Sequence, residues 1–383
     1  MPVLTVIRSR DQFSSLREEW DDLIVRADRN WPFLTWAYLD AAWNRFCSDG
    51  DREALVLICR TNSGQLCGGL PLMFGYEEDR VRKYLLHLSF LGMRFGQTGD
   101  WHAVLSSPDQ VEAVAETFAD AITGPLSADW HILSMMPVLA GCPASQAFFS
   151  ALQKRDVSIH EEDDFPSPFL DLSHGWDVTR QNNTKKLRKN LRNAHRRTVE
   201  THSKDFLEGG KEIEFTASIE LIQLIQHARW GYGPEVSGKY DLFHEDIANL
   251  HIQRGEMFSL ILRFDEEAAA GLFGYLYGEK FWGVMIGRNL EYSDLSPGHQ
   301  LMWEALERIS DRGIKEFDFL GGGGDYKRRW AKESRAFCRY SGVNPSSMRG
   351  KAFHHALSVK HWAIDRARRG KRERLLDGAP LPG

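Results

Sequence analysis

Cysteines and long apolar runs are scarce in this sequence, and each shortage excludes a class of protein. The cysteines are odd in number and show no Cys-x-x-Cys spacing, which argues against a disulfide framework or a structural zinc site. They are Cys47, Cys59, Cys67, Cys142 and Cys338. The longest apolar region, residues 268–287, is broken by Glu279 and Lys280, so it predicts no membrane-spanning helix. The opening segment MPVLTVIRSRDQF lacks the apolar core of a signal peptide, and we expect a cytoplasmic protein without a bound metal.

The formal net charge is only −5, but the basic residues are concentrated in two stretches. Residues 180–197 contain eight Lys or Arg and no acid, and residues 349–374 contain nine against two acids. Together they carry about +15, so the remainder of the chain sits near −20. A basic helix is either a solvated face or a site for phosphate-bearing ligands or an anionic membrane surface. Nucleic acid is disfavoured as a partner because the remainder is acidic and no recognised binding motif is present.

The first half of the chain alternates helices with strands. Apolar residues recur at helical spacing in residues 11–27 and 36–46, which predicts two core-facing helices. Two apolar runs flank the turn-rich TNSG in residues 54–74 and predict a hairpin, which further strands and a helix follow. The acidic, proline-containing segment 160–169 is the best domain-boundary signal, and the basic helix comes after it.

The second half repeats this order of elements. Two predicted helices precede a hairpin in residues 258–278, and a strand, a helix and a strand follow. A shift of 203 residues overlays Gly68 on Gly271 within the two hairpins. We therefore predict a duplicated α/β unit, each half being a mixed sheet with helices on its faces. The predicted parts are a first unit at 1–165, a connecting strand and basic helix at 166–205, a second unit at 206–345 and a basic tail at 346–383.

Four consecutive glycines, residues 321–324, separate the predicted strand KEFDFL from the polar run DYKRRW. Glycine costs packing and backbone entropy, so such a run indicates unusual dihedrals or a backbone that lies close to another molecule. A plain flexible loop is the other interpretation. The run DYKRRW also fits the start of an amphipathic helix with Trp330 as a core anchor.

Six segments carry a resemblance to one family. They are FLTWAYLDAAW, GGLPLMF, LRKNLRNAHRR, HARWG, LSPGHQLMWEA and FDFLGGGGDYKRRW, spread from residue 33 to residue 330. In their order and spacing the chain resembles the CelD-like acetyltransferases associated with bacterial cellulose and exopolysaccharide biosynthesis. That group is placed in the GNAT superfamily and is related in architecture to the Fem-type peptidoglycan aminoacyltransferases. The resemblance implies two tandem GNAT-like units, with an acetyl-CoA or longer acyl-CoA donor held by the second.

The segment SPGHQLMWEALERISDRG agrees with a donor site. Ser296-Pro297-Gly298 predicts a helix start, and Gly313 predicts its end. Unpaired N–H groups of Gly298, His299 and Gln300, at the positive end of the helix dipole, would suit a pyrophosphate. A plain helix start is the alternative interpretation, and the full GNAT pyrophosphate signature, Arg/Gln-x-x-Gly-x-Gly/Ala, is absent.

The resemblance also implies that the glycine run lies where donor and acceptor meet. Acyl transfer to an amine then needs a base and a group that protonates the departing thiolate, and Asp325 and Tyr326 fit these two roles. Lys327 or Arg328 would steady phosphate or oxyanion charge. His299 is the alternative base, because the positive end of a helix lowers the pKa of an imidazole.

Two pairs of residues are weaker candidates for binding the acceptor. Asp100 and His102 lie in the first unit, where they either face the cleft between the units or cap a strand. Arg229 and Trp230 end a helix with an apolar face, where they either line an acceptor pocket or, for Trp230, belong to the core.

The leading prediction is a CoA-dependent N-acyltransferase that acts on an amine of a cell-envelope precursor. The amine belongs to an amino sugar of a polysaccharide or to an amino lipid such as a sphingoid base. The basic segment 346–383 favours the lipid, through peripheral contact with the anionic inner face of the membrane. The alternatives are Fem-like aminoacyl transfer from charged tRNA, with the basic helix along its phosphates, and a non-catalytic module of a polysaccharide synthesis assembly.

Overall fold

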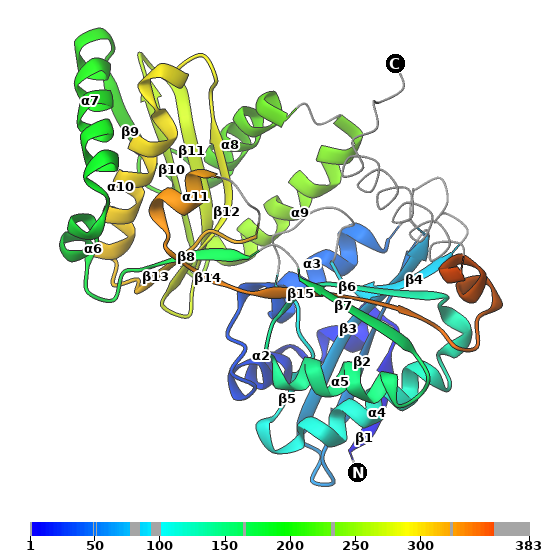
Figure 1. Cartoon of the computed structure of the whole chain (residues 1–383). Coiled ribbons are helices and arrows are strands. Elements are labelled where there is room, and N and C mark those ends of the chain that lie inside the picture. The colour runs from blue at the N-terminus through cyan, green and yellow to red at the C-terminus, as the bar shows by residue number, and fades with distance from the viewer. Residues whose placement is uncertain are drawn as a thin grey trace, which may run out of the picture.

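Two mixed sheets, each with helices on both faces, organise the chain (Figure 1). The computed structural model describes residues 2–48, 50, 52–76, 85–92, 101–163, 166–230, 234–321 and 325–355. The predicted fold class, α/β with two tandem units built on mixed sheets, is confirmed.

The first sheet has the strand order β1-β2-β3-β4-β6-β15-β7, and β5 pairs with β3. Its strands are β1 (Val3–Ile7), β2 (Arg52–Arg60), β3 (Leu66–Tyr76), β4 (Leu86–Phe90), β5 (Leu105–Ser106), β6 (Ile132–Leu139), β7 (Ser158–Asp163) and β15 (Phe337–Val343). One face is covered by α1 (Arg10–Ser14), α2 (Arg17–Arg26) and α3 (Trp36–Phe46). The opposite face is covered by α4 (Val111–Thr123) and α5 (Pro143–Gln153).

The second sheet has the order β14-β8-β13-β12-β11-β10-β9. Its strands are β8 (Ser167–Asp171), β9 (Lys204–Glu208), β10 (Met257–Phe264), β11 (Glu267–Tyr277), β12 (Lys280–Arg288), β13 (Glu316–Asp318) and β14 (Glu333–Arg335). The outer face carries α6 (Trp176–Asn182), α7 (Lys185–Thr201), α10 (Pro297–Asp311) and α11 (Asp325–Trp330). The face toward the first unit carries α8 (Phe215–Trp230) and α9 (Pro234–Ile252) (Figure 1).

Two strands belong to sheets to which the predicted unit boundaries did not assign them. Strand β15 lies within the predicted second unit, yet it pairs with β6 and β7 of the first sheet. Strand β8, predicted as part of a connection, lies inside the second sheet between β14 and β13. Strand pairing joins residues far apart in the chain, so a local apolar pattern does not determine to which sheet a strand belongs.

The two hairpins are equivalent, but with a one-residue difference in their second strands. Gly271 backs onto Ile222 of α8, and Gly69 backs onto Trp20 of α2, both on the face that joins the two units. Gly68 backs onto α4 on the opposite face of the first sheet. Since neighbouring strand residues point to opposite faces, Gly69 is the counterpart of Gly271, one residue from the overlay drawn on the sequence.

One continuous apolar cluster joins the two units. Trp101 of the first unit meets Trp282 of β12 edge to face, with ring centroids 4.6 Å apart. Phe33 meets the same indole at 5.6 Å. Because interlocking aromatic rings pack like a protein interior, the two units are held in one fixed orientation.

Candidate functional site

Strands β12 and β13 lie side by side only where both begin. They pair in parallel through Lys280–Glu316, Phe281–Phe317 and Trp282–Asp318. Strand β12 then continues to Arg288, whereas β13 ends at Asp318 and leads into the glycine run. A strand that outruns its neighbour presents backbone N–H and C=O groups that can bind an extended ligand.

Helix α10 begins beside this opening, at residues predicted to contact a donor. Ser296 is its N-cap in the left-handed conformation (φ 54°), and the Ser296 carbonyl accepts the N–H groups of His299 (3.1 Å) and Gln300 (3.3 Å). Two of the three predicted donors are therefore already bonded within the chain. At Gly298, a Cβ would meet only the Cδ of Arg288, at 3.8 Å, so the backbone is approachable there and a cation lies next to it.

His299 faces this cation-rich helix start and is fixed by α11. The Trp330 indole Nε1–H donates to His299 Nδ1 at 3.1 Å. The His299 pKa is lowered, first by burial and then by the positive charges of Arg329 and Arg288. With Nδ1 accepting a hydrogen bond, the neutral ring carries its proton on Nε2. Neutral His299 is thus a hydrogen-bond donor, whereas uptake of a proton at Nδ1 would break the bond from Trp330.

Replacing Trp330 with Phe should raise the pKa of His299, because Nδ1 then becomes free to take a proton. Because the pKa of His299 is lowered in the native protein, the unfolded chain takes up a proton on this ring at a higher pH than the folded protein does. The folded state therefore loses stability as pH falls below 6.5. Trp330→Phe should reduce that loss. Histidine-labelled NMR titration, with the resonance identified by its absence in His299→Gln, measures the pKa. An unchanged pKa, matching that of a Trp303→Phe control on α10, would contradict the role of Trp330.

Lys327 holds the start of the glycine run. Its ammonium donates to the carbonyls of Phe319 (2.8 Å), Leu320 (3.1 Å) and Gly321 (2.8 Å), and burial lowers its pKa to about 8. These three bonds use all three hydrogens of a lysine ammonium. The predicted contact of Lys327 with a phosphate or oxyanion therefore competes with its bonds to the chain itself.

Asp318, three residues before Gly321, is the centre of a buried polar network. Its Oδ1 accepts from the Ser167 hydroxyl (2.8 Å) and the Leu320 N–H (2.7 Å), and its Oδ2 accepts from Arg335 Nη1 (3.0 Å). Burial raises the pKa of this fully buried carboxyl to about 6. The guanidinium of Arg335 lies 3.9 Å from the ring centroid of Phe169, so it is held from both sides. Leu320 takes the left-handed conformation (φ 54°), which this bonding sustains.

The other predicted catalytic residues lie on α11, which the Trp330–His299 bond ties to the start of α10. Asp325 is the first residue of α11, and its side chain lies outside the described part of the structure. Tyr326 is half-buried and packs against the apolar residues between the second sheet and the helices on its outer face. Arg328 is exposed on the same helix. Their catalytic roles remain predictions.

Of the remaining candidates, Gln300 belongs to this helix start, and the others lie in other parts of the chain. Gln300 is buried and bonds to Thr198 of α7 and to Lys204, so its amide ties helices together. His102 is buried in the first unit, where it stacks on Phe90 and where burial lowers its pKa to about 3. Asp100 lies outside the described residues. Arg229 and Trp230 end α8, and their side chains are likewise not described.

The network around Asp318 and the cation Arg288 were missed in the sequence. Asp318 offered a signal, because FDFL sets an acid between two phenylalanines of a strand, on the face opposite to theirs. A carboxyl on the buried face of a strand requires partners. Nothing in the sequence marked Arg335 as that partner, since it follows a separate helix.

The sequence predicts no bound metal and no membrane-spanning helix. Among the residues that the structure describes, no group of three or more His, Cys, Asp or Glu side chains is placed to hold a metal ion. In the same residues, none of the helices is both long enough and apolar enough to span a bilayer. The basic segment predicted to contact a membrane, residues 346–383, lies mostly outside the residues that the structure describes.

One family model matches a part of this chain that includes α10 and α11. The family model of the acetyltransferase (GNAT) domain matches residues 185–328, from the basic helix through α10 and the glycine run into α11. A search of curated protein sequences gave no match. The likeness to CelD-like proteins thus remains a prediction from the motifs.

Solved structures share the architecture of most of the chain at low sequence identity. A tandem GNAT protein from the clavulanic acid biosynthesis pathway has a TM-score of 0.55 at 13% identity, over 90% of this chain and 100% of that one. FemX has a TM-score of 0.53 at 9% identity, over 79% of this chain and 90% of its own. The C-terminal domain of an Agrobacterium fabrum protein assigned to the lysylphosphatidylglycerol synthetases has a TM-score of 0.50 at 11% identity, over 91% of this chain and 96% of that one. Residues 185–328 therefore match the GNAT acetyltransferase domain, and the chain as a whole has the two-unit fold seen in a tandem GNAT protein.

Proposed function

We propose that this protein is a CoA-dependent N-acyltransferase that moves an acyl group from acetyl-CoA or a longer acyl-CoA to an amine of a cell-envelope precursor. One observation carries the proposal: α10 begins beside the parting of β12 and β13, with Gly298 open next to Arg288. A diphosphate would gain both the helix dipole and a guanidinium there. The match to the GNAT domain covers the same residues.

In the reaction, the amine nitrogen attacks the thioester carbonyl carbon. The N–C bond forms, the C–S bond breaks, the nitrogen loses a proton and the thiolate sulfur gains one. Tyr326 would give the proton to sulfur, and Asp325 would receive the amine proton directly or through water. Neutral His299, with its proton on Nε2, would donate to an anionic group of the donor or to the oxyanion rather than act as the base.

Binding and turnover of defined ligands test the proposal. Calorimetry with acetyl-CoA and a long-chain acyl-CoA should give saturable binding, and release of free CoA thiol should depend on an added amine. An amino sugar and a sphingoid base are the amines to compare, because they represent the two acceptor classes. Absence of acyl-CoA binding, together with absence of thiol release from both donors, would refute the assignment.

Replacing Tyr326 with Phe should lower turnover at least about tenfold while acyl-CoA affinity stays near normal, since general acid catalysis is typically worth about 100- to 10,000-fold. Steady-state kinetics of thiol release, with calorimetry for affinity, gives both quantities. Tyr292→Phe is the matched control, because Tyr292 bonds to Glu267 at the edge of the outer face. Full turnover in Tyr326→Phe would make Tyr326 structural.

A second candidate is aminoacyl transfer from charged tRNA. Two observations favour it: the fold likeness to FemX and the row of cations on α7. In that case an aminoacyl-tRNA should bind, and its affinity should fall steeply with salt, because contacts to phosphates release counterions. Tight tRNA binding that weakens steeply with added salt, without acyl-CoA binding, would favour this candidate over the first.

A further inference from the structure

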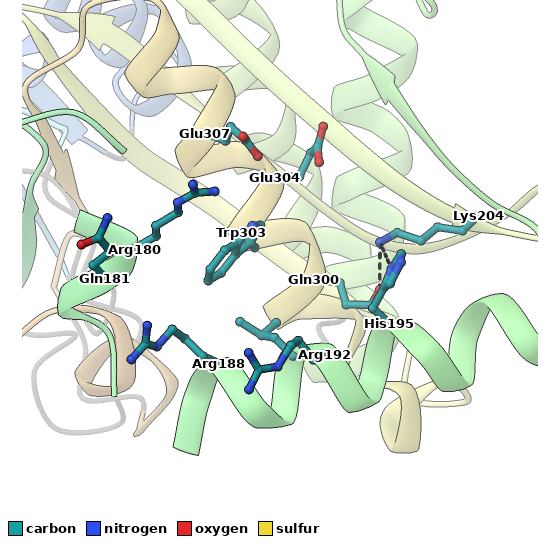
Figure 2. A pocket seen from close by; sticks show the side chains of 11 residues that line it. Arg180, Gln181, Arg188, Arg192, His195, Lys204, Gln300, Trp303, Glu304 and Glu307 are labelled. Carbon is teal, nitrogen blue, oxygen red and sulfur yellow. Dashed lines mark hydrogen bonds between the residues drawn. The ribbon is translucent and has the colours of Figure 1, made fainter. Parts of the chain in front are cut away.

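A pocket of about 520 Å³ lies on the outer face of the second sheet, between α6, α7, β9 and α10 (Figure 2). Its volume is within the range of small-molecule sites. It follows the flank of α10, and Gln300 is a residue that it shares with the predicted donor contacts. The roles proposed for Gly298, His299 and Tyr326 leave this pocket unassigned.

Helix α7 forms the cationic wall of the pocket. Arg188, Arg192 and His195 follow one another at intervals of four and three residues, so they share one face of the helix. In the described part of the chain, neither Arg188 nor Arg192 has a side-chain hydrogen bond or ion pair. By contrast, Arg308 and Arg312 on α10 and just after it are both bonded to Glu208. Two guanidinium groups at this pocket are therefore available to an anion.

Helix α10 forms the opposite wall. Figure 2 shows Trp303 in the middle of the pocket, between Arg180 and the two arginines of α7. Trp303 meets Trp176 edge to face, with centroids 4.9 Å apart, so this neighbour does not stack on it. Glu307, one turn further along α10, lines the pocket as a carboxyl acceptor.

One end of the pocket is closed by side chains already bonded to each other. The Lys204 ammonium donates to Gln300 Oε1 at 2.9 Å and lies 3.3 Å from His195 Nδ1 (Figure 2). Burial lowers the pKa of Lys204. Arg180 and Glu304, which also line the pocket, are paired with Asp177 and Arg308. Among the described residues, the unpaired charged groups and the aromatic group that a ligand would meet are then Arg188, Arg192, Glu307 and Trp303.

The geometry points to a nucleotide site, in which Arg188 and Arg192 bind a phosphate, Trp303 stacks on the base and Glu307 accepts an N–H or O–H of the base or ribose. Guanidinium groups match phosphate oxygens in a fork geometry, and an indole face stacks on any base. A bare anion would make no use of Trp303. A flat membrane surface would not reach into a recess with carboxylates on its far wall.

Calorimetry on the full chain with adenosine 3′,5′-bisphosphate tests this inference, without any need for acyl transfer. The bisphosphate should bind, and the double variant Arg188→Gln/Arg192→Gln should weaken it at least about tenfold through loss of two charge-assisted contacts. Trp303→Ala should weaken it about fivefold or more through loss of stacking. The matched control Lys189→Gln/Arg196→Gln removes two exposed charges from the same helix and should change affinity less than about threefold.

Two comparison ligands separate the components of recognition, and CoA separates the sources of the nucleotide. Tripolyphosphate, which has no base, and adenosine, which has no phosphate, should both bind more weakly than the bisphosphate. If the site takes the nucleotide part of CoA, the double variant should lower the affinity for CoA as much as that for the bisphosphate. If the site takes a separate nucleotide, CoA and the bisphosphate should bind at the same time. No binding of the bisphosphate, equal binding of tripolyphosphate with no effect of Trp303→Ala, or an equal loss in the control would overturn the inference.

Discussion

Replacing Gly298 with Glu should reduce acyl-CoA affinity at least about 100-fold and leave the melting temperature unchanged or slightly higher. The fold accepts the new side chain, because a Cβ at this position meets only the Arg288 side chain, at 3.8 Å. A carboxylate in the first turn of a helix is also favourable to folding. It would, however, neutralise Arg288 and place like charge where we propose that the donor phosphates bind, which would cost several kcal/mol of binding free energy.

Two further variants separate charge from bulk at Gly298. Gly298→Gln has nearly the same size without the charge, and Gly298→Ala adds only the methyl group for which there is room. Calorimetry with acetyl-CoA and thermal melting should give near-native affinity for Ala, an intermediate value for Gln and the large loss for Glu. If Glu binds acetyl-CoA as tightly as Ala does, the donor lies elsewhere.

Replacing Asp318 with Ala should cost about 3 kcal/mol of unfolding free energy at pH 7. The change leaves the Ser167 hydroxyl, the Leu320 N–H and Nη1 of Arg335 without their buried acceptor, although Nη2 of Arg335 keeps its bond to Glu316. Each orphaned donor costs about 1 kcal/mol or more. Asp205→Ala is the matched control, since the Asp205 carboxylate pairs with Arg263 on the surface of the same sheet. Such an exposed pair contributes less than about 1 kcal/mol. Denaturant titration followed by circular dichroism compares the two.

The cost of Asp318→Ala should also depend on pH. The folded pKa of Asp318, about 6, is raised above the ordinary 3.8, so between these values the folded protein holds a proton that the unfolded chain has lost. The stability from this proton is present at low pH and is lost as pH rises through 6. The substitution should therefore cost about 1 kcal/mol more at pH 5 than at pH 7. An equal cost in both aspartate variants, or a greater cost at pH 7, would contradict the network.

The glycine run marks how far the sequence led toward the candidate site. The sequence predicted that the run follows an inner strand and precedes a helix with Trp330 in the core, since the strand and the helix each show local apolar spacing. The sequence did not predict the bonds that Lys327 makes. Its charge indicated a phosphate ligand, whereas its ammonium bonds to three carbonyls at the start of the run. Only the turn of the chain at Leu320 brings those carbonyls to it.

Much of the fold was determined by the sequence alone. Apolar periodicity and turn residues predicted the repeated order of helices and strands and a helix start within Ser296-Pro297-Gly298, because capping and amphipathic spacing act over a few neighbouring residues. The motifs extended this to tandem GNAT-like units. The tertiary structure alone decided that β15 returns to the first sheet, that Trp330 sets the tautomer of His299, and that Arg188 faces Trp303 across a pocket. Each of these joins residues whose separation along the chain carries no local signal, so packing and strand pairing had to bring them together.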